Sequence, residues 1–385
     1  MPEFSGTISS KLPRVGTTIF TVMSKLAQEH NAINLSQGFP DFDCPKELVE
    51  AVHAAMKAGH NQYAPMPGLM KLREMIAEKT EELYKTKYNP DTEITVTVGA
   101  TQAIYTAIAA TIREDDEVII FEPAYDCYEP AIELAGGKTI YMRLKAPNYN
   151  IDWNEVKKVV NHHTRMIIIN SPHNPTGAVL KADDMKQLEK ITKNTDILIL
   201  SDEVYEHIIF DGNVHESMAK YPNLANRSFI VSSFGKTFHT TGWKVGYCIA
   251  PAQLMAEFRK VHQFLVFCVN TSMQFGIAEF LKNKKHYNDL GNFYQKKRDK
   301  FNKLIKGSRF SLVPSPGTYF QLLGYDEITK EKDVDYAVRI IKESGVASIP
   351  ISVFYHKPVF DNMLRFCFAK KDETIEKAAE ILKKI

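Results

Sequence analysis

Short apolar runs alternate with amphipathic stretches from about residue 94 onward. Runs of this length, bounded by polar residues, are typical of buried strands. We therefore predict strands at Ile94–Val98, Val118–Phe121, Thr139–Leu144, Arg165–Asn170, Ile197–Ser201, Phe229–Ser232 and Val245–Ala250. Between them, apolar residues recur at helical spacing, which predicts helices at Thr101–Ile112, Tyr125–Leu134, Ile151–Val160 and Ala182–Ile191. This alternation predicts an α/β fold in which helices cover both faces of a mostly parallel sheet.

The two ends of the chain follow other patterns. Pro45–Lys57 is a predicted helix, because proline suits a first turn and the apolar residues that follow share one face. After about Asn283 we expect a long charged helix, hairpin-like strands around Phe310–Leu322, and strand–helix units to the C-terminus. A chain of 385 residues exceeds one typical core. We therefore predict a large domain over 36–282 and a smaller α/β domain built from 1–35 and 283–385.

Composition narrows the class of protein. The chain is 44% hydrophobic and 24% charged, which is typical of a globular enzyme, and its net charge of +2 gives no strong field for nucleic acid or a membrane surface. The longest aliphatic stretches are too short to span a bilayer, and the first residues lack the apolar segment of a signal peptide. The five cysteines are scattered, as in reduced proteins. We expect a cytoplasmic protein without nucleic-acid or membrane partners.

Residues suited to chemistry follow the predicted strands. They are Gly99, Ala100, Thr101, Tyr125, Asn174, Asp202, Ser233 and Lys236. Because ligands bind at the carboxyl ends of strands in α/β sheets, we expect one site at this edge. A partly desolvated lysine there can act as an amine nucleophile. Gly235-Lys236-Thr237 is not a phosphate loop, since that motif needs glycine where Ile230 stands.

Each of these residues also has an ordinary structural explanation. A lone lysine is usually a solvated surface residue, and Asp202 could cap a helix. Gly99 suits any tight strand-to-helix turn, and Asn174-Pro175-Thr176-Gly177 suits an ordinary turn. Arg365 lies in an alternating run with apolar neighbours, so it needs an anion, either a structural carboxylate or a ligand. It is their combination that points to chemistry.

Taken in order, these motifs resemble a known family. Asn174–Gly177, Ser201–Tyr205, Ser233 with Lys236, Lys244, and Leu364-Arg365-Phe366 are similar to segments of the class I, fold-type I, pyridoxal-phosphate-dependent aminotransferases. The resemblance runs from about Leu35 to the C-terminus. Asn34–Phe42 and Thr240–Gly246 most resemble the methionine and kynurenine aminotransferase branch.

The resemblance implies a role for each residue. Lys236 would bind pyridoxal 5'-phosphate covalently and act as the catalytic base, and Asp202 would keep the ring nitrogen of the cofactor protonated. Tyr125 would stack on the ring, although Tyr128 is also placed to do so, and Asn174 and Tyr205 would bind the phenolic oxygen. The phosphate would be held by Gly99, Ala100, Thr101, Ser233 and Lys244.

The substrate and the assembly follow from the same resemblance. Arg365, with Asn174 and the backbone of Gly38, would hold the substrate α-carboxylate. Tyr63 matches a position that reaches the phosphate of a neighbouring subunit, which implies a homodimer with shared sites. No second arginine can be assigned to a distal carboxylate, and the side-chain pocket is expected to be apolar and aromatic, from Phe20, Phe39, Phe264, Phe267, Tyr319 and Phe320. We therefore expect transfer of the amino group of methionine or of aromatic and large neutral amino acids to a 2-oxo acid.

Other functions are less well supported. No two glycines are two residues apart, so the dinucleotide fingerprint is absent, and His215-Glu216 lacks the second histidine of a zinc protease. No metal site is expected. A carbon–sulfur β-lyase acting on cysteine conjugates or cystathionine would use the same residues and remains the alternative. A transcription regulator would need a DNA-binding module, and about 35 residues before the first motif are too few for one.

Overall fold

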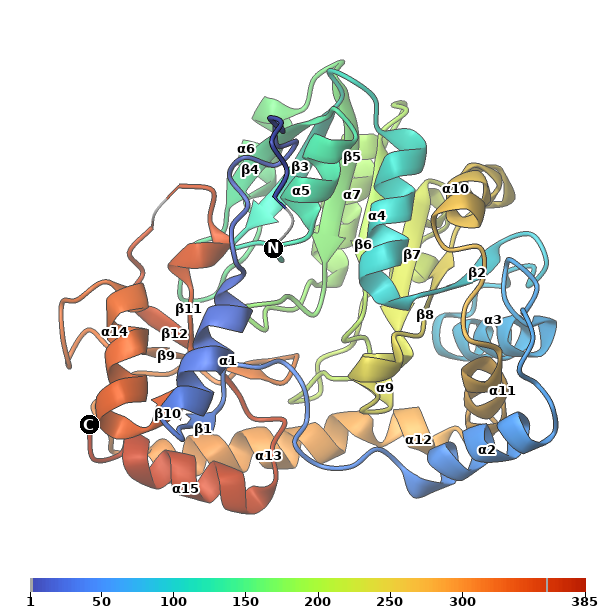
Figure 1. Cartoon of the computed structure of the whole chain (residues 1–385). Coiled ribbons are helices and arrows are strands. Elements are labelled where there is room, and N and C mark those ends of the chain that lie inside the picture. Colours follow the sequence, from blue (N-terminus) through green and yellow to red (C-terminus); the bar gives the residue numbers. More distant parts are fainter. Residues whose placement is uncertain (1–2, 358) are drawn as a thin grey trace.

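The computed structural model describes residues 3–357 and 359–385. Its centre is a seven-stranded sheet with the order β2-β8-β7-β6-β5-β3-β4 (Figure 1). All seven predicted strands lie in this sheet, each within two residues of the predicted ends. Their bounds are β2 Ile94–Thr97, β3 Glu117–Glu122, β4 Lys138–Arg143, β5 Thr164–Asn170, β6 Leu198–Asp202, β7 Ser228–Ser233 and β8 Gly246–Ile249.

The direction of the strands decides which loops meet. Neighbours from β7 through β4 are parallel, whereas β8 is antiparallel to both β7 and β2. Strands β2 and β7 therefore point the same way. The carboxyl ends of β2, β3, β5, β6 and β7 share one edge of the sheet with the amino end of β8.

Helices cover both faces of the sheet, as predicted. Alternate strand residues enter two hydrophobic cores: Ile120, Ile168 and Leu200 pack with one, and Ile119 and Ile167 with the other. The first core is completed by α4 (Gly99–Thr111), α5 (Tyr128–Leu134) and α10 (Ala252–Leu265), and the second by α6 (Trp153–Val159) and α7 (Ala182–Thr192). Helix α5 begins three residues later than predicted, which leaves Tyr125 in the preceding turn.

The N-terminal helix lies against the C-terminal segment (Figure 1). Strand β1 (Ile33–Asn34) pairs in parallel with β10 (Val346–Ala347), and α1 (Ile19–Glu29) contacts β10. A separate antiparallel sheet has the order β11 (Ile349–Pro350), β12 (Met363–Cys367), β9 (Phe320–Gly324). The other helices are α2 Lys46–Lys57, α3 Met70–Tyr84, α8 Pro222–Ala225, α9 Phe234–Thr237, α11 Thr271–Phe280, α12 Lys285–Asn288, α13 Leu290–Ile305, α14 Asp333–Arg339 and α15 Asp372–Leu382.

The hairpin-like strands predicted around Phe310–Leu322 are wrong. Only β9 is a strand there, and it pairs with the distant β12, while Ser311 forms a single bridge to Gly324. The intervening segment contains Pro314 and Pro316, which have no N–H to donate to a ladder. Over the described residues, no helix is long and apolar enough to cross a membrane.

Candidate active site

A cleft at the carboxyl edge of the large sheet collects most of the predicted residues. They come from the turns after β2, β3, β5, β6 and β7 and from the turn before β8. The lining residues are Gly99, Ala100, Thr101, Ile104, Tyr125, Asn170, Asn174, Asp202, Val204, Tyr205, Ser233, Lys236, Thr241 and Lys244. The strand-end prediction is therefore confirmed as geometry.

Lys236 lies on the short helix α9 directly after β7. Its Nζ donates to the Gly38 carbonyl oxygen at 3.1 Å and to the Tyr319 hydroxyl at 2.9 Å. Burial lowers the pKa of Lys236 to about 8, and the positive charges of Arg365 and Lys244 act in the same direction. A substantial neutral fraction near physiological pH is what an amine nucleophile requires.

Asp202 is a buried carboxylate at the end of β6. Its Oδ2 accepts from the Tyr128 hydroxyl at 2.6 Å and its Oδ1 accepts from the Val204 amide at 3.3 Å. Burial raises the pKa of Asp202 to about 6, against the lowering effect of these donors. The helix-cap alternative is wrong, because a turn and not a helix follows Asp202. A cationic ligand atom would stabilise the charged carboxylate.

The opposite end of the cleft is suited to an anion. Gly99 opens α4 with φ +71°, and a Cβ there would lie 3.4 Å from the ammonium group of Lys244. The absence of a side chain leaves the first N–H groups of α4 open to a ligand. Ser233 and Thr101 line the same cleft and carry hydroxyl groups. These features form a cradle for a phosphate group.

Arg365 is 1% exposed on β12, and the groups that accept hydrogen bonds from it are neutral. Nη1 donates to Asn174 Oδ1 at 2.8 Å and Nη2 to the Ser36 carbonyl at 3.1 Å, whereas Nε has no partner. The guanidinium lies 3.9 Å from the ring centroid of Phe320 and 5.2 Å from that of Phe20. Within the described part of the chain no carboxylate forms an ion pair with it, so the structural-pair alternative is not supported. A carboxylate ligand fits this fork.

Four predicted residues lie outside the cleft of their own chain, and one of them, Phe39, is 44% exposed and lines another hollow with Lys370. Tyr63 and Phe264 are 82% and 87% exposed, and Phe267 packs edge-on against Tyr63 at 5.4 Å. By contrast, Phe20, Tyr319 and Phe320 are near Arg365 or Lys236. The aromatic set predicted for the side-chain pocket is therefore not brought together within one chain.

The sequence prediction missed two hydroxyl groups. Tyr128 was considered for ring stacking, but its hydroxyl binds Asp202, while Tyr125 lines the cleft. The sequence predicts Tyr319 only as a residue of an apolar and aromatic pocket, whereas its hydroxyl accepts from Lys236 and donates to the Gly38 carbonyl. The sequence does contain a signal for two separate roles, because Tyr125 and Tyr128 are three residues apart and side chains at this spacing can face different parts of one site.

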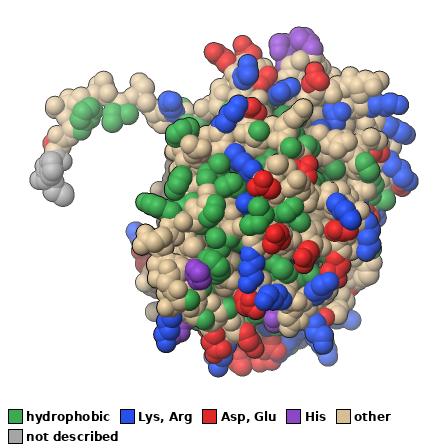
Figure 2. Space-filling view, turned by 90° about the vertical axis from the view of Figure 1, so that its right-hand side faces the viewer, with side chains coloured by type: hydrophobic (Ala, Val, Ile, Leu, Met, Phe, Trp, Pro, Cys, Tyr) green, Lys and Arg blue, Asp and Glu red, His purple; other side chains and the backbone are tan. Residues whose placement is uncertain are grey.

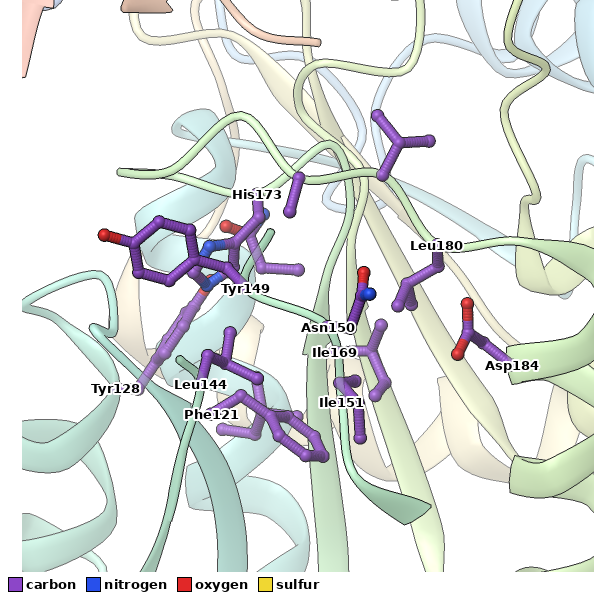
Figure 3. Close-up of a pocket in the computed structure, with 14 residues that line it drawn as sticks. Phe121, Tyr128, Leu144, Tyr149, Asn150, Ile151, Ile169, His173, Leu180 and Asp184 are labelled. Carbon is purple, nitrogen blue, oxygen red and sulfur yellow. The ribbon is translucent and has the colours of Figure 1, made fainter. Parts of the chain in front are cut away.

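A second hollow lies behind Tyr128 (Figure 3). Tyr128, Tyr149 and His173 stand on one side of it, and Leu180 and Asp184 on the other. Burial lowers the pKa of His173 to about 4, so this ring is neutral, and Asp184 accepts from Trp153 at 2.8 Å. No lysine or arginine lines the hollow. Its lining therefore offers no cationic side chain to an anionic cofactor.

The main cleft fits pyridoxal phosphate. Lys236 offers an amine for the aldehyde, Asp202 offers a buried carboxylate for the ring nitrogen, and the turn at Gly99 offers the phosphate cradle. The unpartnered Nε of Arg365 leaves a donor for a substrate carboxylate. No group of metal-ligating side chains is found among the residues that the structure describes.

Comparison with known proteins agrees with this site. The family model for aminotransferases of class I and II matches residues 30–382. The chain is 49% identical to the methionine aminotransferase of Escherichia coli (strain K12) over 377 residues, covering 98% of each chain, and 32% identical to kynurenine–oxoglutarate transaminase 1 of Homo sapiens, covering 94% of each. A crystal structure of YbdL from Escherichia coli, described as having a methionine aminotransferase function, matches with a TM-score of 0.97 at 48% identity, covering 98% of this chain and all of that one. The chain therefore belongs to the class I and II aminotransferases, a family of pyridoxal-phosphate-dependent enzymes.

Proposed function

We propose that this aminotransferase takes the amino group from methionine and from large neutral or aromatic amino acids and gives it to a 2-oxo acid. The observation that carries the proposal is Arg365, a buried guanidinium with an unpartnered Nε, whose Nη1 donates to Asn174 in the lining of the cleft that holds Lys236. Arg365 and Asn174 bind the α-carboxylate in a fixed direction. The α-carbon of the substrate is thereby presented to the amine of Lys236.

Lys236 then moves the α-proton. Gly38 and Tyr319 hold its ammonium group at 3.1 and 2.9 Å, and a pKa of about 8 allows the group to accept and return a proton at neutral pH. When bound, the cofactor supplies an electron sink for the α-carbon. Asp202 supports that sink by holding a proton on the ring nitrogen, and Tyr128 orients the carboxylate.

The preference for apolar substrates is supported by the surroundings of Arg365. The rings of Phe20, Phe320 and Phe354 lie within 5.5 Å of its guanidinium carbon. Arg14, in the groove beside Tyr125, is engaged by Glu129 and Glu133. A distal carboxylate would be desolvated there without a cation, whereas each well-placed methylene of an apolar side chain contributes about 1–3 kcal/mol.

A panel of amino donors with a common 2-oxo acid tests this proposal. We expect kcat/KM for methionine and phenylalanine to exceed that for aspartate by about a hundredfold or more. A kcat/KM for aspartate equal to that for methionine would refute the preference. Pyruvate released from cystathionine would instead favour the carbon–sulfur β-lyase.

We also propose that the enzyme works as a homodimer with shared sites. Figure 2 shows hydrophobic side chains gathered on the face that carries α2, α3, α10 and α11. The exposed residues of these elements and the adjoining loops are Val49, Met56, Tyr63, Met70, Phe264, Leu265 and Phe267. A patch of this kind is unfavourable in water unless covered, and a second copy would place Tyr63 and Phe267 at the neighbouring site.

Complementation tests the shared site. Mixing Tyr63→Phe chains with Lys236→Ala chains should produce hybrid dimers in which one site carries neither change, and activity should exceed the sum of the parents. Light scattering that finds only monomers at working concentration would refute the proposal.

We further propose a division into two domains, a large one over 36–282 and a smaller one built from 1–35 and 283–385. The pairing of β1 with β10 supports this division. A cytoplasmic location is likewise a proposal.

A further inference from the structure

The turn after β6 carries buried acidic groups that take no direct part in the chemistry above. Asp202 and Tyr205 line the cleft, whereas Glu203 and Glu206, from the same turn, are 2% and 6% exposed outside it. Glu203 is held by the Ser201 hydroxyl at 2.8 Å and by further donors. Hydrogen bonds to buried carboxylates therefore hold this turn in place, and the donors to Glu206 come from more elements than those to Glu203.

Glu206 joins three separate elements. Its Oε1 accepts from Lys79 Nζ at 2.6 Å, the Ser232 hydroxyl at 2.8 Å and the Tyr247 hydroxyl at 3.0 Å, and its Oε2 accepts from the Tyr84 hydroxyl at 2.6 Å. Lys79 and Tyr84 lie on α3, Ser232 on β7 and Tyr247 on β8. One carboxylate thus links the turn of β6 to a helix and two strands.

The pair of charges is isolated from water. Side chains of Lys79 and Glu206 are 4% and 3% exposed. Burial opposes ionisation of Glu206, but the charge of Lys79 and the hydroxyl donors outweigh it and hold the pKa of Glu206 below its ordinary value. Burial lowers the pKa of the adjacent His207 to about 3, and Lys79 adds to this effect, so His207 is neutral. The cluster therefore contains one cation and one anion.

A buried ion pair of this kind is not explained by stability alone. Two apolar side chains of similar volume often stabilise a protein as well or better, because the charges lose their hydration. What the pair adds is a fixed position, because a carboxylate that accepts four short hydrogen bonds restricts the backbone of its own residue to few positions. Glu206 directly follows Tyr205 in the sequence. Its partner Ser232 directly precedes Ser233 and lies four residues before Lys236.

We propose that the Lys79–Glu206 pair is a positioning clamp for the cofactor site, which sets the turn bearing Asp202 and Tyr205 against the β7–α9 segment bearing Ser233 and Lys236. The inference rests on the roles proposed above for Asp202 and Lys236 and on the cofactor contacts expected of Tyr205 and Ser233. Neither Lys79 nor Glu206 lines the cleft. They act only through the segments that they join.

A neutral double variant tests the clamp. Removing one charge leaves the other buried and unpaired, which can prevent folding, so Lys79→Met is combined with Glu206→Gln. Misplacement by about an ångström costs on the order of a hundredfold in rate. We expect the double variant to fold, but kcat to fall about tenfold or more and the Kd of the cofactor-free full chain for pyridoxal phosphate to rise about tenfold. KM for methionine should stay within about threefold, because Arg365 lies on another sheet.

A matched pair controls for the substitutions themselves. Glu216 also accepts from a lysine and a tyrosine, Lys220 at 2.8 Å and Tyr221 at 2.7 Å, but this less buried pair joins neither the turn after β6 nor β7. Lys220→Met with Glu216→Gln should leave cofactor Kd, the absorption spectrum of bound cofactor and kcat unchanged. Wild-type values of all three in the Lys79–Glu206 double variant would overturn the clamp. Cofactor still held covalently by a Lys236→Ala chain would instead overturn the proposed site and the clamp with it.

Discussion

Asp202→Asn should make the cofactor-free protein more stable while removing its activity. In the cofactor-free protein, burial raises the pKa of Asp202 from 3.8 to about 6, so the charged form is disfavoured in the folded state. One pKa unit corresponds to about 1.4 kcal/mol. At pH 7.5 the ionised carboxylate therefore costs the folded protein about 3 kcal/mol relative to a carboxylate in the unfolded chain.

The effect of the Asp202 carboxyl on the stability of the folded protein depends on pH. A raised pKa means that the folded state holds the proton more tightly, so stability is lost as pH rises from about 4 to about 6 and is then constant. At pH 4.5 the same calculation gives a cost of about 1 kcal/mol. The asparagine must also set an amide N–H₂ against the Tyr128 hydroxyl or the Val204 amide, a loss of about 1 kcal/mol. The variant should thus gain about 2 kcal/mol at pH 7.5 and about nothing at pH 4.5.

Urea unfolding of cofactor-free protein at the two pH values measures this difference. Asp333→Asn is the matched control, because Asp333 is also buried but accepts from the Ser352 amide and hydroxyl at 2.7 Å, so its loss should destabilise the protein. In the loaded enzyme, Asp202→Asn should lower kcat by about a hundredfold or more, since a neutral amide cannot hold a proton on the ring nitrogen. A variant that is less stable at pH 7.5, or that turns over at the wild-type rate, would refute the reasoning.

Three further predictions follow from the site. Lys236→Ala should fold but hold no cofactor covalently and show negligible transamination; borohydride reduction and peptide mapping test this, and a label on another lysine would contradict it. The cofactor-free enzyme should capture pyridoxal phosphate covalently at a rate that rises with pH around a midpoint of about 8, because only the neutral amine of Lys236 attacks. A rate that does not change over roughly one pKa unit on either side of this midpoint would contradict the prediction. Arg365→Lys should raise KM for methionine by about tenfold or more, because lysine keeps the charge but loses the fork, and an unchanged KM would assign the carboxylate to another group.

The family and the main sheet could be predicted from the sequence because both are local signals. Buried strands such as Met166–Ile169 are continuous apolar runs, and motifs such as Ser201–Tyr205 are contiguous. The error near Phe310–Leu322 arose where apolar residues were mistaken for paired strands although Pro314 and Pro316 interrupt the ladder. There the Gln321 side chain replaces backbone pairing, since it donates to the Val313 carbonyl at 2.8 Å and accepts from the Ser315 amide at 3.1 Å.

Contacts between distant segments could not be predicted in this way. Tyr128 and Asp202 are 74 residues apart, and Lys79 and Glu206 are 127 apart. Nothing in the local pattern of α3 distinguishes Lys79 from the solvated lysines of other helices. The local pattern around Arg365 predicts only a charge that needs an anion; its neighbour Asn174 was expected from the resemblance alone, and the contact with the Ser36 carbonyl was not predicted.

The direction of β8 explains how one residue that precedes a strand joins a site made from residues that follow strands. Apolar runs show where strands lie but not which way they point, so Lys244 was placed in the site by resemblance alone. Because β8 is antiparallel to both neighbours, its amino end meets the carboxyl ends of β2 and β7. Lys244, with φ +54°, turns the chain there, and its ammonium group lies 3.4 Å from the position that a Cβ on Gly99 would occupy. The cation and the amino end of α4 thus meet at one edge of the sheet, and reversing β8 would move Lys244 to the opposite edge.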